Sequence, residues 1–325
     1  MAKARAIVKR RKAVRNIRKI TKTMQLIATT KFQKSLKRAV AMKPFTEKLR
    51  EVVAELAGSI EKADHPLLRE VDPAKRSGRV AHVVVTSDRG LCGAYNGSVI
   101  RAAAAFIRQR EQAGLAIDLY AAGKKGYSYF NYQKRAVKRR LDQVGDEPTF
   151  ETVAPIAQQL MDRFIAGEVD SVHVTFMNFI SSSRQRSETF TLLPLAGLQE
   201  SADHLGRQVA EKEAQVAAGS MDLKRTGDDV SLHPTVVHGK TLYDFSPSAA
   251  DLLDELLPAT VKVALFQCFL DAVTSENVAR MIAMKSATDN ADKLIKSLTM
   301  QYNRARQTQI TTELSEIMGG VEAMK

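Results

Sequence analysis

The sequence predicts an α/β domain combined with a long antiparallel α-helical coiled coil, which the two ends of the chain form together. Residues 259–318 contain neither Gly nor Pro, so an uninterrupted helix there would be about 90 Å long at 1.5 Å per residue. Residues 2–43 also lack Gly and Pro and would form roughly 60 Å of helix. Between these segments β-branched runs alternate with helical runs, which is typical of an α/β domain.

Both terminal segments carry apolar residues three or four positions apart, which favours a coiled-coil seam over the wider face of a core helix. In the N-terminal segment these residues are Val14, Ile17, Ile20, Met24 and Ile27. In the C-terminal segment they are Val278, Met281, Met284, Ala287, Ala291, Leu294, Leu298 and Ala305. If the ends of the intervening domain lie close together, the two helices pair antiparallel.

The central segment is expected to form a parallel or mixed sheet with helices on both faces. A linker precedes it, marked by Pro66, Pro73, Ser77 and Gly78. The pattern predicts strands at residues 82–86, 116–122, 169–179 and 188–193. It predicts helices at residues 96–112 and 153–165, and a short helix through Tyr129 after the glycines of 123–126.

The composition is that of a soluble protein with a sizeable core, since 44% of the 325 residues are hydrophobic. No run of 18 continuous apolar residues predicts a membrane-spanning helix, and the N-terminus lacks the apolar region of a signal peptide. A mitochondrial transit peptide is discounted because the helical seam begins within the Arg-rich N-terminus. Cys92 and Cys268 lack metal-ligand spacing, which indicates a reducing compartment without structural zinc.

The positive charge is concentrated at the N-terminus. Residues 1–40 contain 14 Lys and Arg and no acid, whereas the whole chain carries a net charge of +13. Such a helix suits nucleic acid, a membrane surface or an acidic protein. Phe32 is its only aromatic residue, which disfavours nucleic-acid stacking, and the narrow apolar stripe lacks the Trp or Tyr anchors of a membrane helix. An acidic protein partner is therefore favoured.

No catalytic, metal or cofactor site is predicted in the central domain. The glycines that follow its first two strands match neither GxGxxG nor GxxxxGK[ST]: Gly90, Gly93, Gly97, Gly123 and Gly126. The six histidines are scattered, and His82 and His173 fall in predicted strands, where a core or edge histidine is the default.

Four motifs stand out along the chain. They are ITKTMQLIA at residues 20–28, TSDRGLCGAYN at 86–96, ARMIAMKSATDN at 279–290 and YNRARQTQITTEL at 302–314. In this order they resemble the gamma subunit of F-type ATP synthases, and the resemblance covers about residues 1–198 and 241–325. It implies a coiled coil rooted in a Rossmann-like domain without a nucleotide site.

The resemblance also implies the role of a central-stalk rotor in a proton-translocating ATPase. The coiled coil would turn inside a hexamer of alpha and beta subunits, and the foot would contact the epsilon subunit and the ring of c subunits. The delta subunit would be a partner only indirectly. The subunit itself would be non-catalytic, hold no cofactor and bind no nucleic acid. It would reach the membrane only through the complex, at the cytoplasmic face of the bacterial plasma (inner) membrane.

Individual positions match functional positions of the family. The resemblance implies coupling contacts to the hexamer at Met24, Arg280, Arg306, Gln307, Thr311 and Glu316. It implies foot contacts toward the ring and epsilon at Tyr243 and Phe245. Of these, Arg306 and Gln307 would hydrogen-bond the loops of beta, and Met24 would lie near the beta lever.

The domain organisation expected from these features has four parts. Residues 1–60 and 259–325 form the shaft, residues 78–198 the α/β foot, and residues 242–258 the connection between foot and C-terminal helix. Residues 199–241 form a polar insertion that departs from the family pattern. Because it contains no Cys, it cannot act as the dithiol switch of chloroplast members. We expect it to modulate rotation and to be dispensable for assembly.

Two other functions are weighed against the rotor. A basic coiled-coil nucleic-acid-binding protein is the main alternative, and an enzyme with a Rossmann nucleotide site is the third. Salt-dependent binding of DNA at physiological ionic strength would favour the first of these, whereas purification with a membrane ATPase would eliminate it.

Overall fold

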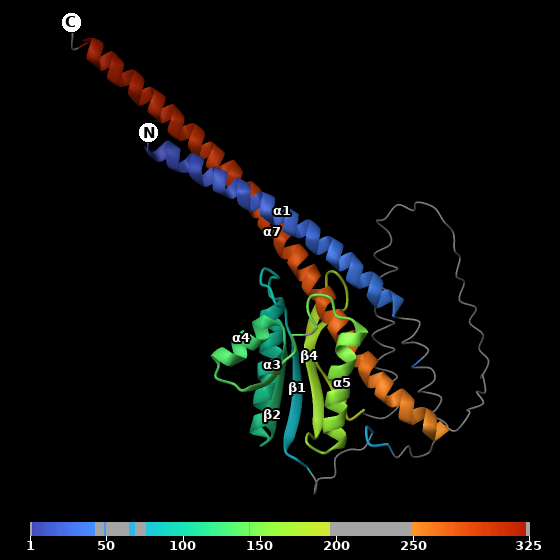
Figure 1. The fold of residues 1–325 in the computed structure, drawn as a ribbon. Coiled ribbons are helices and arrows are strands. Elements are labelled where there is room, and N and C mark those ends of the chain that lie inside the picture. Colours follow the sequence, from blue (N-terminus) through green and yellow to red (C-terminus); the bar gives the residue numbers. More distant parts are fainter. Residues whose placement is uncertain are drawn as a thin grey trace, which may run out of the picture. The chain divides into compact units, whose positions relative to one another are not determined.

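The computed structural model describes residues 2–42, 49, 65–68, 76–142, 144–195 and 249–322 (Figure 1). The chain folds into two compact units. The coiled-coil unit comprises Met1–Gln33, Leu91–Gly93 and Asn277–Lys325, and the α/β unit comprises Lys34–Gly90 and Ala94–Glu276. Helices α1 (Ala2–Ala41) and α7 (Ala249–Glu322) each contribute to both units.

The α/β unit contains a five-stranded sheet in the order β3-β2-β1-β4-β5. Its strands are β1 (Arg79–Val85), β2 (Ala116–Ala122), β3 (Val137–Arg140), β4 (Ser171–Phe179) and β5 (Gln185–Leu193). The first four run parallel, and β5 pairs antiparallel with β4. The sheet is therefore mixed, as expected for an α/β domain whose last strand follows a hairpin rather than a helix.

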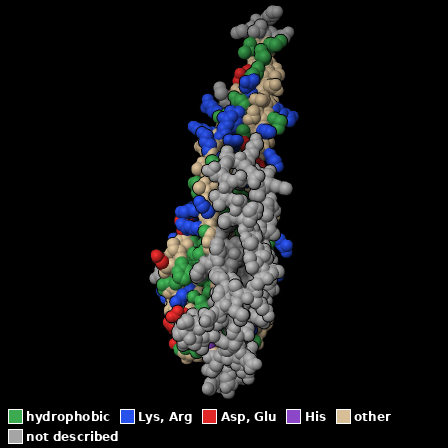
Figure 2. Space-filling model, turned by 90° about the vertical axis from the view of Figure 1, so that its right-hand side faces the viewer, with side chains coloured by type: hydrophobic (Ala, Val, Ile, Leu, Met, Phe, Trp, Pro, Cys, Tyr) green, Lys and Arg blue, Asp and Glu red, His purple; other side chains and the backbone are tan. Residues whose placement is uncertain are grey.

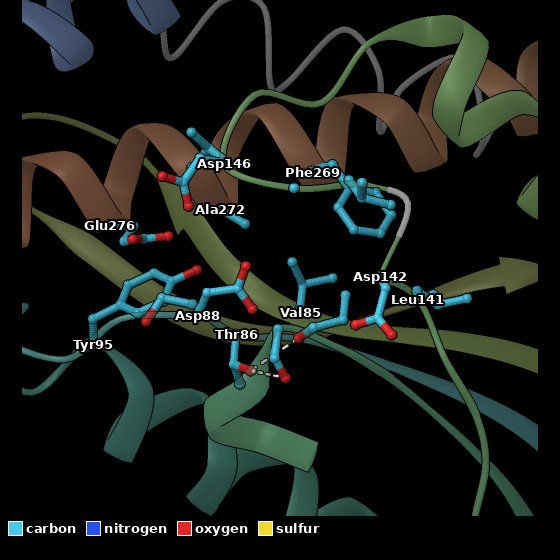
Figure 3. A pocket seen from close by; sticks show the side chains of 16 residues that line it. Val85, Thr86, Asp88, Tyr95, Leu141, Asp142, Asp146, Phe269, Ala272 and Glu276 are labelled. Atoms are coloured by element: carbon cyan, nitrogen blue, oxygen red, sulfur yellow. Dashed lines mark hydrogen bonds between the residues drawn. The ribbon is translucent and has the colours of Figure 1, made fainter. Parts of the chain in front are cut away.

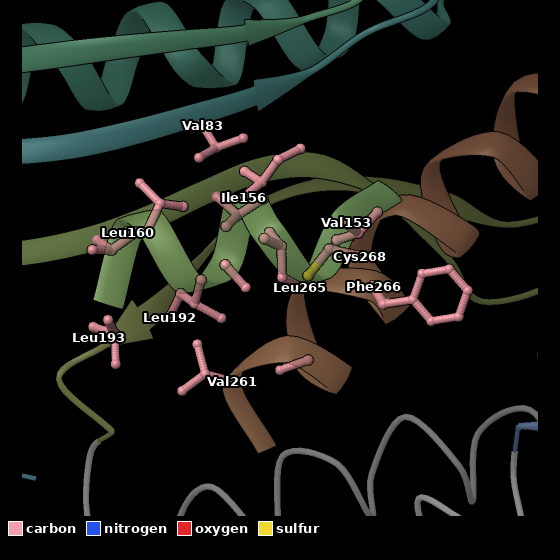
Figure 4. Packing of buried hydrophobic residues seen from close by; sticks show 14 of the residues in the cluster. Val83, Val153, Ile156, Leu160, Leu192, Leu193, Val261, Leu265, Phe266 and Cys268 are labelled. Atoms are coloured by element: carbon pink, nitrogen blue, oxygen red, sulfur yellow. The ribbon is translucent and has the colours of Figure 1, made fainter. Parts of the chain in front are cut away.

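The helices of this unit cover both faces of the sheet. They are α3 (Tyr95–Gln112), α4 (Lys124–Tyr132) and α5 (Phe150–Ile165), together with the first part of α7. Side chains alternate along β1: Val83 packs in the core with α5 and α7, whereas the next residue toward the N-terminus, His82, contacts Phe106 of α3. Figure 4 shows Val83 on one side of this core, with the side chains of α5 and α7 packed beneath the sheet.

The first part of α7 is a core helix rather than part of the coiled coil. Residues 260–272 are buried except for the half-buried Lys262, and they include Val261, Leu265 and Phe269. A helix that is apolar all round belongs in a core, and only a helix with a narrow apolar seam belongs in a coiled coil. The expected start of the shaft at residue 259 is therefore corrected, because the coiled-coil unit takes over at Asn277. An 18-residue window of α7 is apolar enough to cross a membrane, but 72% of that window is buried inside the protein.

Other boundaries also differ from the sequence-based expectation. Helix α7 begins at Ala249 and continues through Pro258, so residues 249–258 are helical and not a connecting segment. Burial of Leu257 and Val261 on either side holds the helix together at the proline. Strand β3 was not predicted, because the sequence VKRR has no apolar run and forms a short edge strand. Helix α5 starts three residues early, where Thr149 and Thr152 form a reciprocal capping box.

The expected architecture is confirmed: a mixed α/β sheet domain with a long C-terminal helix that pairs with the N-terminal helix. The polar insertion at residues 199–241 lies outside the described residues, as do Tyr243 and Phe245. The domain boundaries that involve them stay predictions.

Candidate functional site

Helices α1 and α7 run antiparallel in the coiled-coil unit (Figure 1). In the described part of the chain, the contacts that join them include the following three. The guanidinium of Arg11 lies 5.2 Å from the centre of the Tyr302 ring. Arg18 Nε lies 2.5 Å from Asp292 Oδ1, and the Thr288 hydroxyl donates to that of Thr21 at 2.8 Å. As residue numbers rise along α1 the partners fall along α7, which fixes the antiparallel direction.

The seam between the helices follows a strict alternation of three and four residues. On α1 it consists of Ile7, Arg11, Val14, Arg18, Thr21, Gln25, Ala28 and Phe32. On α7 it consists of Asn277, Met281, Met284, Thr288, Ala291, Ile295, Leu298, Tyr302, Ala305 and Gln309. This 3.5-residue period is the signature of a left-handed coiled coil. The α1 side is unusually polar, because Arg, Thr and Gln occupy half of its positions.

Of the seam expected on α1, Val14 lies in the observed seam, whereas the three isoleucines lie one residue away from it. Ile17, Ile20 and Ile27 are 53%, 60% and 53% exposed, whereas the residues that follow each of them face α7. Full burial of an isoleucine contributes about 1.5–3 kcal/mol, so the three half-exposed side chains together forgo roughly 3 kcal/mol. A threonine pair, a surface ion pair and a cation–π contact each contribute about 1 kcal/mol and offset that loss. Between Ile17 and Ile27, hydrophobic periodicity alone therefore selects the wrong face of α1.

The seam expected on α7 is mostly right. Met281, Met284, Ala291, Leu298 and Ala305 lie in the observed seam. The clearest error again concerns adjacent residues: Leu294 is 49% exposed, and Ile295 takes the seam position. Apolar residues dominate this side of the seam, so the hydrophobic pattern and the packing agree.

The outward face of α1 is strongly basic. Exposed Lys and Arg side chains on it include Lys9, Arg10, Lys12, Arg15, Lys19 and Lys22. Figure 2 shows Lys and Arg side chains gathered over the part of the molecule that the terminal helices form, with few acidic side chains among them. A surface of this kind attracts an acidic partner, and the attraction weakens as salt is raised.

The loops at the carboxyl ends of β1, β2 and β3 surround a small acidic pocket (Figure 3). The carboxylates around it belong to Asp88, Asp142, Asp146 and Glu276. This edge of a parallel sheet is where nucleotide-binding domains hold phosphate, at the N-terminus of the next helix. Asp142 pairs with Arg140 and Asp146 pairs with Arg89, so these carboxylates disfavour a phosphate by occupying the nearby cations as well as by their charge.

The backbone donors at the start of α4 are already used by the chain itself. The N–H of Lys124 donates to Asp88 Oδ1 at 2.9 Å, and the N–H of Lys125 donates to the Ser87 carbonyl at 3.1 Å. The N–H of Gly126 donates to the Thr86 hydroxyl at 2.8 Å. The Asp88 carboxylate thus occupies the place that an anion takes at a helix N-terminus. A phosphate could bind here only by displacing it.

The two strand histidines are core residues, as expected. His82 Nε2 lies 2.7 Å from Thr175 Oγ1, and His173 Nδ1 lies 3.1 Å from Thr191 Oγ1. Phe106 stacks against both rings, with centroids 4.7 Å apart in each case. Burial and the neighbouring His173 lower the pKa of His82 to about 3, and burial and Arg110 lower the pKa of His173 to about 4. Both rings are therefore neutral at physiological pH.

The positions expected to contact partner subunits are distributed along the two terminal helices. Met24 of α1 and Arg280 of α7 are half-buried, whereas Arg306, Gln307, Thr311 and Glu316 of α7 are exposed. Gln307 and Thr311 lie one turn apart on the exposed surface of α7, where the Thr311 hydroxyl donates to the Gln307 carbonyl of its own helix at 3.0 Å.

Comparison with known proteins places the chain in a family. A family model described as ATP synthase matches residues 3–324. An ATP synthase gamma chain from Rhodopirellula baltica is 41% identical over the full length of both chains. One from a Nocardioides species is 38% identical over 96% of this chain and 93% of its own length. The chain belongs to the ATP synthase gamma chain family.

Solved structures share the fold of this gamma-family chain. A chain of the Euglena gracilis mitochondrial ATP synthase, in an assembly of OSCP, F1 and c-ring, matches with a TM-score of 0.60. The match covers 99% of this chain and 95% of that one at 16% identity. A chain from the rotor of the same enzyme matches with a TM-score of 0.55 at 14% identity, over 95% of this chain and 99% of that one. At these identities the likeness concerns the fold.

Sequence reasoning missed the polar seam residues of this gamma-family member. Thr21 and Thr288 meet in the seam, and Arg18 meets Asp292, yet none of the four stands out by residue type. A usable signal was present: a 3.5-residue repeat counted from Ala28, instead of from the isoleucines, runs through Thr21 and Arg18.

Proposed function

We propose that this gamma-family chain is the central-stalk rotor of a membrane-bound F-type ATP synthase. It couples ion-driven rotation of the membrane ring to conformational change at catalytic sites on the beta subunits. The carrying observation is the antiparallel coiled coil, whose surface differs from side to side: α1 presents a dense basic face, and α7 does not. One asymmetric rod cannot contact three equivalent sites alike, so each orientation biases each site's conformational equilibrium differently.

The chain itself is proposed to be non-catalytic and to hold no nucleotide. The support is the strand-end geometry, where Asp88 fills the helix N-terminus and carboxylates surround the pocket. Calorimetric titration of ATP into the purified chain tests this, and heat of binding that disappears in Gly90 or Gly93 variants would refute it.

The proposed partners are the alpha and beta subunits around the coiled coil, and the epsilon subunit and the ring of c subunits at the foot. The delta subunit is reached only indirectly. The complex lies at the cytoplasmic face of the bacterial plasma membrane, and this chain touches the membrane only through it. The basic face of α1 suits an acidic surface on the hexamer. A pull-down from membranes that recovers none of these subunits would reject the assignment.

Arg306 is proposed as a coupling contact that forms in only some rotational states. Its side chain is exposed, and guanidinium can donate a fork of hydrogen bonds to a carboxylate. A hydrogen bond to a charged group contributes about 1.5–3 kcal/mol, so Arg306→Ala should lower ATP turnover and proton pumping about tenfold in an assembled complex. Gln307→Ala should be milder, and the pair should be less than additive if both contact one loop.

The control is Lys296→Ala, which removes an exposed cation from the same helix ten residues earlier. Assembly, ATPase rate and ATP-driven proton pumping are measured on the same membranes. Equal activities for Arg306→Ala and wild type, with full assembly, would remove Arg306 from the mechanism.

The nucleic-acid-binding alternative retains one supporting observation, the exposed basic face of α1. Binding of duplex DNA to the purified chain at 150 mM salt, with an affinity that falls steeply as salt rises, would support it. We expect no such binding at that ionic strength.

A further inference from the structure

The observed orientation of α1 about its own axis places Ile7, Val14, Ala28 and Phe32 in the seam, but between residues 17 and 27 it leaves larger apolar side chains in water. Ile17, Ile20 and Ile27, the isoleucine stripe, are each more than half exposed. Met24, which is half-buried, lies between the last two at the same spacing. Turning α1 by one residue, about 100°, would bring the whole stripe into the seam against α7. The helix holds the other orientation.

Two polar contacts at the centre of the seam oppose that turn. Thr288 is 6% exposed, and its hydroxyl donates to the Thr21 hydroxyl. The Thr21 hydroxyl in turn donates to the Arg18 carbonyl oxygen at 3.1 Å. One layer away, Arg18 pairs with Asp292. In the turned helix, Ile20 would replace Thr21, and the buried Thr288 hydroxyl would lose its partner across the seam and keep only the Met284 carbonyl of its own helix, at 2.8 Å. The site of Arg18 would pass to Ile17, and Asp292 would lose its cation.

Polar residues at seam positions of coiled coils are known to select one arrangement at some loss of stability. Here the arrangement they select keeps an apolar stripe in water. Such a stripe is unfavourable for an isolated chain, and it is useful only when a partner covers it.

We propose that Thr21, Thr288, Arg18 and Asp292 are positioning residues that hold α1 with its isoleucine stripe outward, as a docking surface for an acidic and partly apolar protein surface. The chemistry of the partner follows from the flanking side chains: Lys19 and Lys22 border the stripe, and no acid occurs in the sequence before Glu47. The proposal rests on the proposed function in taking that partner to be a subunit of the surrounding complex.

The orientation of α1 can be read by pulsed electron paramagnetic resonance on the full-length chain. Spin labels are placed at Lys22→Cys and Asp289→Cys, both exposed, while burial shields the native Cys92 and Cys268 from the label. With the seam intact we expect one distance. With Thr21→Val, Thr288→Val and Asp292→Asn combined, we expect a second population, in which the α1 label has moved roughly 9 Å around the helix axis.

The matched control changes two threonines whose hydroxyls make no contact across the seam. Thr23→Val and Thr299→Val remove hydroxyls that bond only to their own helices, at Lys19 and Ile295 carbonyls. This control should retain the single distance. A single wild-type distance in the triple variant as well would overturn the proposal.

A charge exchange tests the ion pair even if the triple variant fails to fold. Arg18→Asp alone should populate the second distance, and adding Asp292→Arg should restore the first. A merely structural role would not give this rescue of orientation. Failure of the exchange to restore the single distance would count against a positioning role for the pair.

The number of protons pumped per ATP hydrolysed, measured in membranes that contain the assembled complex, tests whether the isoleucine stripe is a docking surface. The triple variant should pump at most half as many protons per ATP hydrolysed as wild type, while the off-seam control keeps the wild-type ratio. A turned α1 with unchanged coupling would overturn the docking surface. The resonance measurement uses the purified chain, so it tests the orientation of α1 independently of the proposed function. If the proposed function were wrong, the wild-type chain would be absent from the membrane ATP synthase.

Discussion

Asp118 of β2 holds together the base of the α/β unit through three cations. Its carboxylate accepts hydrogen bonds from Lys138 Nζ and Arg163 Nη2, each at 2.6 Å, and lies 3.3 Å from Arg79 Nη1. Burial alone would raise the pKa of Asp118, but the hydrogen bonds from Lys138 and Arg163 outweigh it and hold the pKa below its ordinary value. The substitution Asp118→Asn keeps the shape and removes the charge.

The expected loss of stability follows from what each cation retains. The Arg163 side chain is 11% exposed and loses one of three partners, keeping Glu168 at 2.7 Å and the Tyr120 hydroxyl at 2.6 Å. One hydrogen bond to a charged group contributes about 1.5–3 kcal/mol. The other two cations are about half exposed and return to water with little loss. We therefore expect Asp118→Asn to lower the free energy of unfolding by about 2 kcal/mol.

Urea unfolding of the full chain, followed by tyrosine fluorescence, measures this loss, since the chain has no Trp and seven Tyr. Asp142→Asn is the control, because it removes a 61% exposed carboxylate paired with Arg140 and should lower the free energy by less than about 0.5 kcal/mol. Because the folded-state pKa of Asp118 is lowered, its contribution to the free energy of unfolding is fully present above the unfolded-state pKa, which is near 4. This contribution is lost as the pH falls through the folded-state pKa of Asp118. Equal effects of the two substitutions at pH 7, or a difference that does not shrink as the pH falls below 4, would refute the reasoning.

Two further predictions concern the α/β unit. Gly123→Ala should lower the free energy of unfolding by about 3 kcal/mol in urea titrations, because φ is +86° and a Cβ would lie 2.1 Å from the Thr86 carbonyl oxygen. The control is Gly114→Ala, which has φ +79° but open space around it and should lower the free energy of unfolding by only about 1 kcal/mol. Similar losses for the two substitutions would contradict the steric argument. Burial lowers the pKa of His82 to about 3 and that of His173 to about 4, so below pH 6.5 the unfolded chain binds more protons than the folded chain. The free energy of unfolding therefore falls from pH 6.5 toward pH 4 by up to about 1.4 kcal/mol per pH unit for each ring. The urea midpoint of His173→Gln should therefore depend less on pH over this range, and an unchanged pH dependence would show that the ring is not responsible.

The fold could largely be predicted because buried parallel strands carry an unmistakable pattern. Strands β1, β2 and β4 read as β-branched or apolar runs, since both of their faces are covered. Strand β3 escaped because an edge strand needs no apolar run. The early start of α5 depends on Thr149 and Thr152, whose hydroxyls act on backbone donors that no hydrophobic pattern records.

The surface proposed for coupling was harder to predict than the fold. Sequence periodicity shows which face of a helix is apolar, and the prediction then places that face against the partner helix. In α1 this failed because Thr21 and Arg18 have partners on α7 that only the paired structure shows. On α7, where Met284 and Leu298 fill the seam, the same reasoning succeeded. The contacts expected at Arg306 and Gln307 depend on other subunits and stay predictions.

The occupied helix terminus at Asp88 has a consequence for the enzyme as a whole. Adenine nucleotides and phosphate rise and fall in the cell as the machine works, and a vacant Rossmann-type cradle at the foot of the shaft would sense those changes. The chain supplies its own acceptors to the first backbone donors of α4: the Asp88 carboxylate, the Ser87 carbonyl and the Thr86 hydroxyl. If the chain holds no nucleotide, as we propose, the occupancy of that cradle would not vary with the nucleotide pool of the cell.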